Sequence, residues 1–293
     1  MRTRAQHRKG IALMVGATLC WASAGVLVRS MEVHDGWTIT FCRSAFMTAF
    51  LLIVLSLQHR SQLPRRIRDM GWPGIVSGLL FALMFICFIL ALSKTTVANT
   101  LVVGSISPFA AALFGRIFLH ESVATRTWIA MIPAMGGITL MFFDALSIGG
   151  WGGNLIALCI PIAFAVNVVL LRKHRAVVDL IPSILLAGIF SMLLTLPFAL
   201  PLAVNASDLG LLAAMGVFQL GLGLLLLLLA VPYLSSAEIA LLSILEIIFG
   251  VLSTWLLIGE RPCDAALAGG SIVIGALVTN QIAGLRQRTT SKV

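Results

Sequence analysis

Residues 91–121 read ALSKTTVANTLVVGSISPFAAALFGRIFLHE, and residues 230–260 read AVPYLSSAEIALLSILEIIFGVLSTWLLIGE. The two stretches align without gaps at an offset of 139 residues. Each opens with a short polar turn, continues as an apolar stretch and closes with Glu. An apolar helix of about 20 residues is long enough to cross a hydrocarbon core of ~30 Å. The chain therefore contains the same membrane-spanning unit twice.

The rest of the chain has the same membrane character. Hydrophobic residues make up 59% of the 293 residues, charged residues make up 11%, and the mean hydropathy is +1.05. The longest polar gap, residues 58–70, is too short to bury a core of its own. We therefore predict an all-α integral membrane protein of ten transmembrane helices, with no soluble domain. The predicted spans are residues 11–29, 37–57, 73–92, 96–118, 125–143, 151–171, 180–201, 209–231, 236–258 and 264–284.

The repeat places five spans in each half. Residues 1–146 form the first predicted repeat and residues 147–293 form the second. Near the start of each half, GATLCWASAGVLVRS (16–30) parallels CIPIAFAVNVVLLRK (159–173), which pairs Arg29 with Arg172. Because five is an odd number, the second copy is inverted relative to the first. Inverted repeats in the membrane plane are typical of secondary transporters, and the sequence therefore predicts a transporter.

The distribution of basic residues predicts the orientation of the spans. With the amino terminus inside, sixteen of the 20 Lys and Arg residues fall on the cytoplasmic side and three fall outside. Cytoplasmic loops of membrane proteins carry such an excess. Ten spans then leave both termini cytoplasmic. We predict a multi-pass protein of the cell inner (plasma) membrane, and the net charge of +9 indicates this topology rather than nucleic-acid binding.

Four motifs resemble the drug/metabolite transporter superfamily, EamA type. They are CWASAG (20–25), TFCRSAF (40–46), SISPFAAALFGRIFLHE (105–121) and ILEIIFGVLSTWLLIGE (244–260). Within the superfamily the chain is most similar to exporters of the YddG type. That resemblance implies export of aromatic and other neutral amino acids, or similar small metabolites, by alternating access. The chain departs from the family in having Ile247 where a proline often follows the glutamate of span nine.

Polar side chains within the spans are the first candidates for a substrate site, since an intramembrane charge costs about 2.5–3.5 kcal/mol on insertion scales unless it is solvated. Arg43 has two interpretations, a ligand for a substrate carboxylate or a structural group bonded to carbonyls of a neighbouring helix. Glu246 either takes a substrate ammonium or a coupling proton, or packs as a structural carboxylate. Through the repeat, Glu238 aligns with Asn99. Glu246 aligns with Ser107, so polar positions recur at equivalent depths.

A proline and several aromatic side chains complete the candidate site. Pro108 follows Ser107 in the middle of span four, where we expect it to bend the helix and leave a carbonyl available to a ligand or water. Trp21 pairs with Phe164 through the repeat, and the two are expected to wall a central pocket. The predicted substrate-binding residues are Trp21, Arg43, Phe85, Asn99, Ser107, Pro108, Phe164, Asn167, Gln219 and Glu246.

Other function classes have less support from the sequence. There is no Walker A motif, so ATP hydrolysis by this chain is not indicated. The five cysteines form no C-x-x-C pair and the acidic residues are scattered, so we predict no metal, no cofactor and no enzyme. A lipid or lipid-linked-sugar translocase on the same scaffold is the alternative, with Arg29 and Lys94 placed to meet headgroups.

The expected partners are a small-molecule substrate and the lipid bilayer. Glycines allow close approach of helices in membranes, and a cluster of them in spans five and ten indicates either a packing surface or a homodimer surface. The glycines concerned are Gly136, Gly137, Gly269, Gly270 and Gly275.

Overall fold

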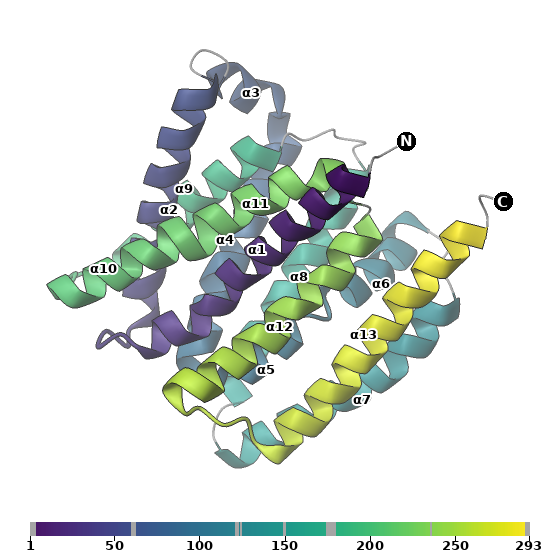
Figure 1. Cartoon of the computed structure of the whole chain (residues 1–293). Helices are drawn as coiled ribbons and strands as arrows, with labels where there is room; N and C mark the ends of the chain where they lie inside the picture. The colour runs from purple at the N-terminus through teal and green to yellow at the C-terminus, as the bar shows by residue number, and fades with distance from the viewer. Residues whose placement is uncertain are drawn as a thin grey trace.

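The computed structural model describes residues 4–59, 63–120, 123, 125–148, 151–173, 180–234 and 236–290, which form a helical bundle without strands (Figure 1). The helices are α1 (Arg4–Arg29), α2 (Gly36–His59), α3 (Leu63–Asp69), α4 (Gly71–Lys94), α5 (Val97–Gly104), α6 (Ser107–Leu119), α7 (Thr125–Ile148), α8 (Trp151–Lys173), α9 (Leu180–Ala199), α10 (Ala206–Ala214), the π-helix η1 (Met215–Leu222), α11 (Gly223–Ala230), the 3₁₀ turn η2 (Val231–Tyr233), α12 (Ser236–Ile258) and α13 (Asp264–Thr290).

Eight helical segments of the described chain are long and apolar enough to cross a membrane. They are α1, α2, α4, the α5–α6 pair, α8, α9, the rod from α10 to η2, and α12. The predicted fifth and tenth spans fall on α7 and α13, whose apolar parts, Thr127–Leu140 and Asp264–Asn280, are shorter. Large side chains such as Leu256 and Ile132 are 78% and 76% exposed, as expected of a surface that faces lipid. The chain is therefore a multi-pass membrane protein, and the count of ten spans stays a prediction.

The predicted break in span four separates α5 from α6. Pro108 has no N–H to donate to the carbonyl of Gly104, and the Ser107 hydroxyl donates to that carbonyl instead, at 2.6 Å. The α5 helix ends at Gly104, and α6 begins again at Ser107. The freed carbonyl therefore already accepts one hydrogen bond from the preceding side chain, and its availability to a ligand or water stays a prediction.

The rod from α10 to η2 contains a feature that the sequence did not predict. Its middle, η1, is a π-helix, and glycines on it and next to it touch two neighbouring helices. A Cβ atom on Gly216 would lie 2.6 Å from the Arg43 carbonyl of α2, and one on Gly223 would clash with the Trp21 indole nitrogen of α1. Such close approach requires glycine, so η1 is packed directly against α1 and α2.

Three hydrogen bonds fix the relative directions of two pairs of helices. Arg29, the last residue of α1, donates to the Thr95 carbonyl, and the Thr95 hydroxyl donates to Asn154 at the start of α8. The end of α1 thus lies beside the start of α8, so the two helices run in opposite directions. Glu260, just after α12, accepts the backbone N–H of Val97 at the start of α5. The α5–α6 pair and α12 are therefore antiparallel as well.

The helices pack in a pattern that centres on α1 and α8. Helix α1 packs against α12 and against the α10–η2 rod, whereas α8 packs against α5, α6 and α4. Helices α2 and α9 form a pair in which the Ser44 hydroxyl donates to that of Ser191 at 2.8 Å. The α7 and α13 helices stand together at one side of the bundle (Figure 1). There a Cβ on Gly137 would lie 2.5 Å from the Gly269 carbonyl, so these two glycines serve packing within the chain.

The start of α1 and the end of α13 lie toward the same end of the bundle (Figure 1). At that end His7 meets Glu238 at 2.7 Å, and the Lys9 ammonium lies 5.4 Å from the centre of the Tyr233 ring. We call the opposite end, where α1 finishes at Arg29, the far end. The far end holds the α1–α2 and α9–α10 connections and the start of α5.

The glycine contacts of the α10–η2 rod give a stability prediction. Gly216→Ala places a methyl group 2.5 Å from the Phe46 Cβ, so we expect a loss of about 1–3 kcal/mol from overpacking. Gly210→Ala is the matched control on the same rod, because nothing lies within 4 Å of its added carbon. The melting temperature in detergent should fall for Gly216→Ala and stay level or rise for Gly210→Ala. Equal melting temperatures for the two variants would contradict the packing of η1 on α2.

Candidate functional site

Four of the predicted substrate-binding residues gather around η1. Gln219 belongs to η1 itself, and Trp21 of α1 lies against the glycine that follows it. Arg43 of α2 presents its carbonyl to Gly216, and its side chain reaches Phe85 of α4. π-Helical turns are frequent at functional sites because they displace side chains from the regular helical register. The structure therefore brings α1 and α2 together on one irregular turn, and α4 joins them through the contact of Arg43 with Phe85.

Arg43 is 1% exposed, and its contacts match the structural interpretation of this residue. One terminal nitrogen donates to the Phe85 carbonyl at 2.9 Å, and the guanidinium lies 5.7 Å from the centre of the Phe85 ring. Its Nε atom is buried and has no hydrogen-bond partner among the described residues. The guanidinium thus holds α2 to α4, while one donor remains unused.

Trp21 and Gln219 differ in how much of each side chain is accessible. Trp21 is half-buried, whereas Gln219 is 3% exposed. The amide oxygen of Gln219 is buried and finds no partner in the described part of the chain. A buried acceptor that is left unsatisfied costs about 1–3 kcal/mol. This acceptor therefore has free capacity for a polar group of a ligand or for water.

Asn99 lies in a second group, near the far end. Its amide nitrogen lies 3.4 Å from the Thr95 hydroxyl, and that hydroxyl donates to the Asn154 amide oxygen at 2.8 Å. Both asparagines are buried, at 5% and 0% exposure. The Asn99 oxygen and the Asn154 nitrogen have no partners within the described chain. Asn154 was not predicted, because a single asparagine at the start of a span carries no sequence signal of its own.

The remaining predicted residues lie on α6, α8 and α12. Ser107 caps the break before α6 as described above, and Pro108 beside it is exposed. Phe164 and Asn167 lie on α8, where Phe164 is half-buried and Asn167 is 2% exposed. The Asn167 amide oxygen is buried without a partner among the described residues. Glu246, on α12, is half-buried.

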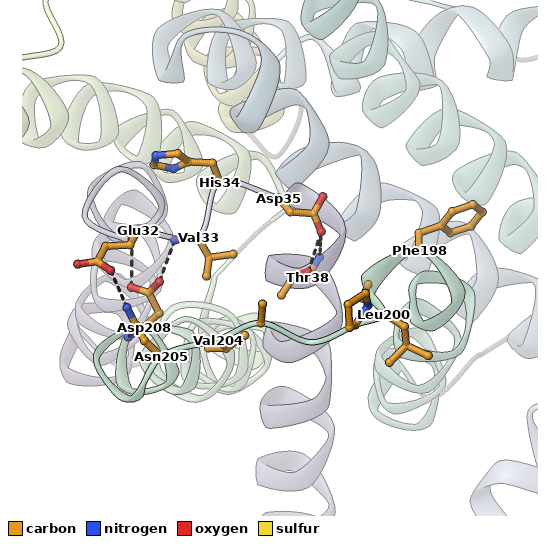
Figure 2. A pocket seen from close by; sticks show the side chains of 13 residues that line it. Glu32, Val33, His34, Asp35, Thr38, Phe198, Leu200, Val204, Asn205 and Asp208 are labelled. Carbon is orange, nitrogen blue, oxygen red and sulfur yellow. Dashed lines mark hydrogen bonds between the residues drawn. The ribbon is translucent and has the colours of Figure 1, made fainter.

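A recess of about 710 Å³ opens at the far end, away from all the predicted substrate-binding residues (Figure 2). Its carboxylates are engaged in holding the fold. Asp208, 1% exposed, accepts the backbone N–H groups of Glu32 and Val33 at 3.1 and 2.8 Å, and Asp35 accepts from Thr38 at the start of α2. Figure 2 shows the Asn205 side chain reaching Glu32, at 2.7 Å. The recess is thus built from helix caps that join the α1–α2 connection to α10.

One ion pair at the far end was missed as a candidate. Arg29 donates from Nε to Glu260 at 2.6 Å and from Nη2 to the Thr95 carbonyl at 2.8 Å. The sequence contained a signal for it. The repeat pairs Arg29 with Arg172 and closes both aligned stretches with Glu, so an arginine and a glutamate recur in each half.

Comparisons with known proteins agree with a transporter. Residues 8–143 match the EamA-like transporter family. The pseudopaline exporter CntI of Pseudomonas aeruginosa, in strains UCBPP-PA14 and ATCC 15692, is 25% identical over 278 residues, which cover 92% of this chain and 95% of that protein. A crystal structure at 18% identity superposes with a TM-score of 0.62 over 95% of this chain and 98% of its own, and it shows the fold alone. Together these similarities indicate a membrane transporter and not an enzyme.

The contacts of Arg43 generate a prediction that separates its two interpretations. Arg43→Met removes the hydrogen bond that ties α2 to the Phe85 carbonyl of α4, so we expect a lower melting temperature whether or not substrate is present. Arg116→Gln, on the exposed side of α6, is the matched control and should leave the melting temperature unchanged. A variant that keeps the parent melting temperature but binds substrate more weakly would instead identify Arg43 as a substrate ligand.

Proposed function

We propose that this protein exports amino acids, aromatic and other neutral ones among them, or similar small metabolites across the inner membrane by alternating access. The coarser part of this proposal rests on the EamA-like match and on full-length similarity to an exporter. The observation that carries the finer part is the group of buried, unsatisfied polar atoms within the spans, on Arg43, Asn167 and Gln219. In hydrocarbon such atoms persist where a ligand or water meets them.

The inverted arrangement of the two halves is the second part of the proposal. Helices α1 and α8 hold corresponding places in the halves and run in opposite directions. In chain order, α1 corresponds to α8, α2 to α9, α4 to the α10–η2 rod, α5–α6 to α12, and α7 to α13. When each helix is replaced by its counterpart, the contacts of α1 with α12 and with the rod become the contacts of α8 with α5–α6 and with α4. The packed pairs α2–α9 and α7–α13 are unchanged by this replacement, because each consists of two counterparts. This exchange supports an axis in the membrane plane about which the halves rock.

The unsatisfied atoms also favour a class of cargo. Arg43 and Asn154 offer unused donors, whereas Gln219, Asn99 and Asn167 offer unused acceptors. A zwitterionic amino acid carries a carboxylate that accepts and an ammonium that donates, so it complements both kinds. Trp21, half-buried beside η1, provides an aromatic surface for an apolar side chain. These features support a small zwitterion more than a bulky lipid.

The lipid-translocase alternative needs basic side chains that are available to headgroups. Arg29, one of the two basic residues on which it depends, is already bonded to Glu260 and to the Thr95 carbonyl. Lys94 is exposed. The arrangement of Arg29 therefore favours a structural role over headgroup binding.

Transport by the purified full-length chain in proteoliposomes tests the proposal. We expect saturable movement of labelled Thr, Met or aromatic amino acids, with a pH gradient imposed in parallel to reveal any coupling. The lipid-translocase alternative is tested in the same vesicles by adding a fluorescent phospholipid and measuring how much of it becomes accessible to chemical reduction from outside. If lipid moves and no amino acid or small metabolite does, the exporter proposal is wrong.

Trp21 gives a prediction for affinity. Trp21→Ala removes the aromatic surface next to η1, so the apparent Km for aromatic substrates should rise about tenfold, while that for Thr changes less. Thr139→Val is the control, because its exposed hydroxyl bonds only the carbonyl of Met135 on its own helix. Unchanged Km values in a folded Trp21→Ala variant would remove this residue from the site.

A further inference from the structure

The Arg29–Glu260 pair joins three helical segments at the far end. The Glu260 carboxylate accepts Arg29 Nε with one oxygen at 2.6 Å and the Val97 backbone N–H with the other at 2.8 Å. Arg29 also donates to the Thr95 carbonyl at 2.8 Å. The two side chains are only 28% and 21% exposed, so water screens their attraction less than on an open surface. One ion pair thus fastens α1 and α12 to the beginning of α5.

A second polar layer extends this connection to a fourth helix. The Thr95 hydroxyl donates to Asn154 of α8 at 2.8 Å, next to the carbonyl that Arg29 occupies. The helices joined are therefore α1, α5, α8 and α12. Under the proposed repeat these are two corresponding pairs, α1 with α8 and α5–α6 with α12. A link among all four holds the two halves together at one end of the molecule.

Apolar packing seals the space next to the ion pair. A Cβ atom on Gly25 of α1 would lie 2.7 Å both from the Thr254 hydroxyl of α12 and from a methyl group of Val97. Thr254 is 1% exposed and Val97 is 3% exposed. No solute passes between α1, α5 and α12 here unless the helices separate. Separation requires that the contacts of Glu260 with Arg29 and Val97 break.

The closed arrangement leaves hydrogen-bonding capacity unused. The Asn99 oxygen and the Asn154 nitrogen, which flank the Thr95 hydroxyl, are buried and lack partners in the described chain. Opening would admit water to both atoms and so favour the open state. The ion pair opposes that tendency. Two opposing contributions at one place make an element that can occupy either of two states.

We propose that Arg29 and Glu260 are gating residues that close the far end of the transport path. This inference rests on the proposed function, because a gate has a role only where a solute crosses. The predicted topology places the far end outside the cell, so the pair forms an outer gate. Arg29 closes it as a fork, with one nitrogen on Glu260 and another on the Thr95 carbonyl.

Cysteine accessibility tests the gate in the full-length chain. The five native cysteines are replaced by alanine, and Thr254→Cys reports on the sealed space next to Glu260. A membrane-impermeant maleimide is applied to intact cells, and Ser30→Cys, exposed at the same end, shows that the reagent reaches this side. If Ser30→Cys reacts only in inside-out vesicles, the reagent is applied there. Reaction in denaturant confirms that the reporter thiol is intact.

We expect Glu260→Gln to raise the labelling rate of Thr254→Cys about tenfold, because charged hydrogen bonds contribute enough to shift an equilibrium by that factor. Arg29→Lys keeps the charge but loses the fork, so its labelling rate should rise less. Arg261→Gln is the matched control. It breaks an exposed pair with Asp264 at the same end, 3.9 Å apart, and should leave labelling unchanged.

Unchanged labelling in both Glu260→Gln and Arg29→Lys would overturn the gate, as would an equal rise in Arg261→Gln. If Glu260→Gln does not fold, Arg29→Lys alone decides. Transport measured in parallel keeps the two proposals apart. If substrate moves but labelling is unchanged, the gate proposal is wrong and the exporter proposal stands. If labelling increases but no small metabolite moves, the Arg29–Glu260 pair still controls opening of the far end, and the proposed export function is wrong.

Discussion

Backbone groups inside a hydrocarbon core have no water to bond, and this constraint shapes every irregular part of the bundle. Where Pro108 removes an N–H donor, the adjacent Ser107 hydroxyl replaces it on the Gly104 carbonyl. Where the α10–η2 rod widens into a π-helix, glycines bring it against α1 and α2, so protein covers most of the irregular turn and Phe218 stays 47% exposed. Irregular backbone at membrane depth is tolerated where protein or a cavity surrounds it, which is also where a substrate is best placed.

The polar contacts between helices fall into two kinds. Those that are complete hold the architecture, as the Asp208 carboxylate does when it accepts two backbone N–H groups of the α1–α2 connection. Those that are incomplete, on Gln219, Asn99, Asn154 and Asn167, leave donors or acceptors that a solute or water would satisfy. Arg43 belongs to both kinds, since it bonds Phe85 and still has one unused nitrogen. The incomplete contacts support the proposed path, and the complete ones form the frame around it.

Much of the helical layout could be predicted because hydropathy and length determine a span directly. The break at Pro108 was predicted too, although the fate of the Gly104 carbonyl depends on the rotamer of one serine, which sequence does not fix. The π-helix carries no pattern in the sequence beyond its glycines. The short helix α3 lies in the polar gap that the sequence treated as a loop. Asn154 became apparent only when the bundle placed the start of α8 beside Thr95. The repeat carried a signal for the Arg29–Glu260 pair, but the ends of α1 and α12 are distant in sequence and only the bundle shows that they meet.

The central claim is that the two halves are inverted copies, and equivalent residues at the ends of α1 and α8 test it most directly. The repeat pairs Ser30 with Lys173, both exposed. In a chain whose native cysteines are replaced, Ser30→Cys and Lys173→Cys are treated separately with an impermeant maleimide on intact cells. Inversion predicts that Ser30→Cys reacts at once and that Lys173→Cys reacts only after the membrane is permeabilised. Reaction of both positions from the same side would contradict the inverted repeat and the transport mechanism built on it.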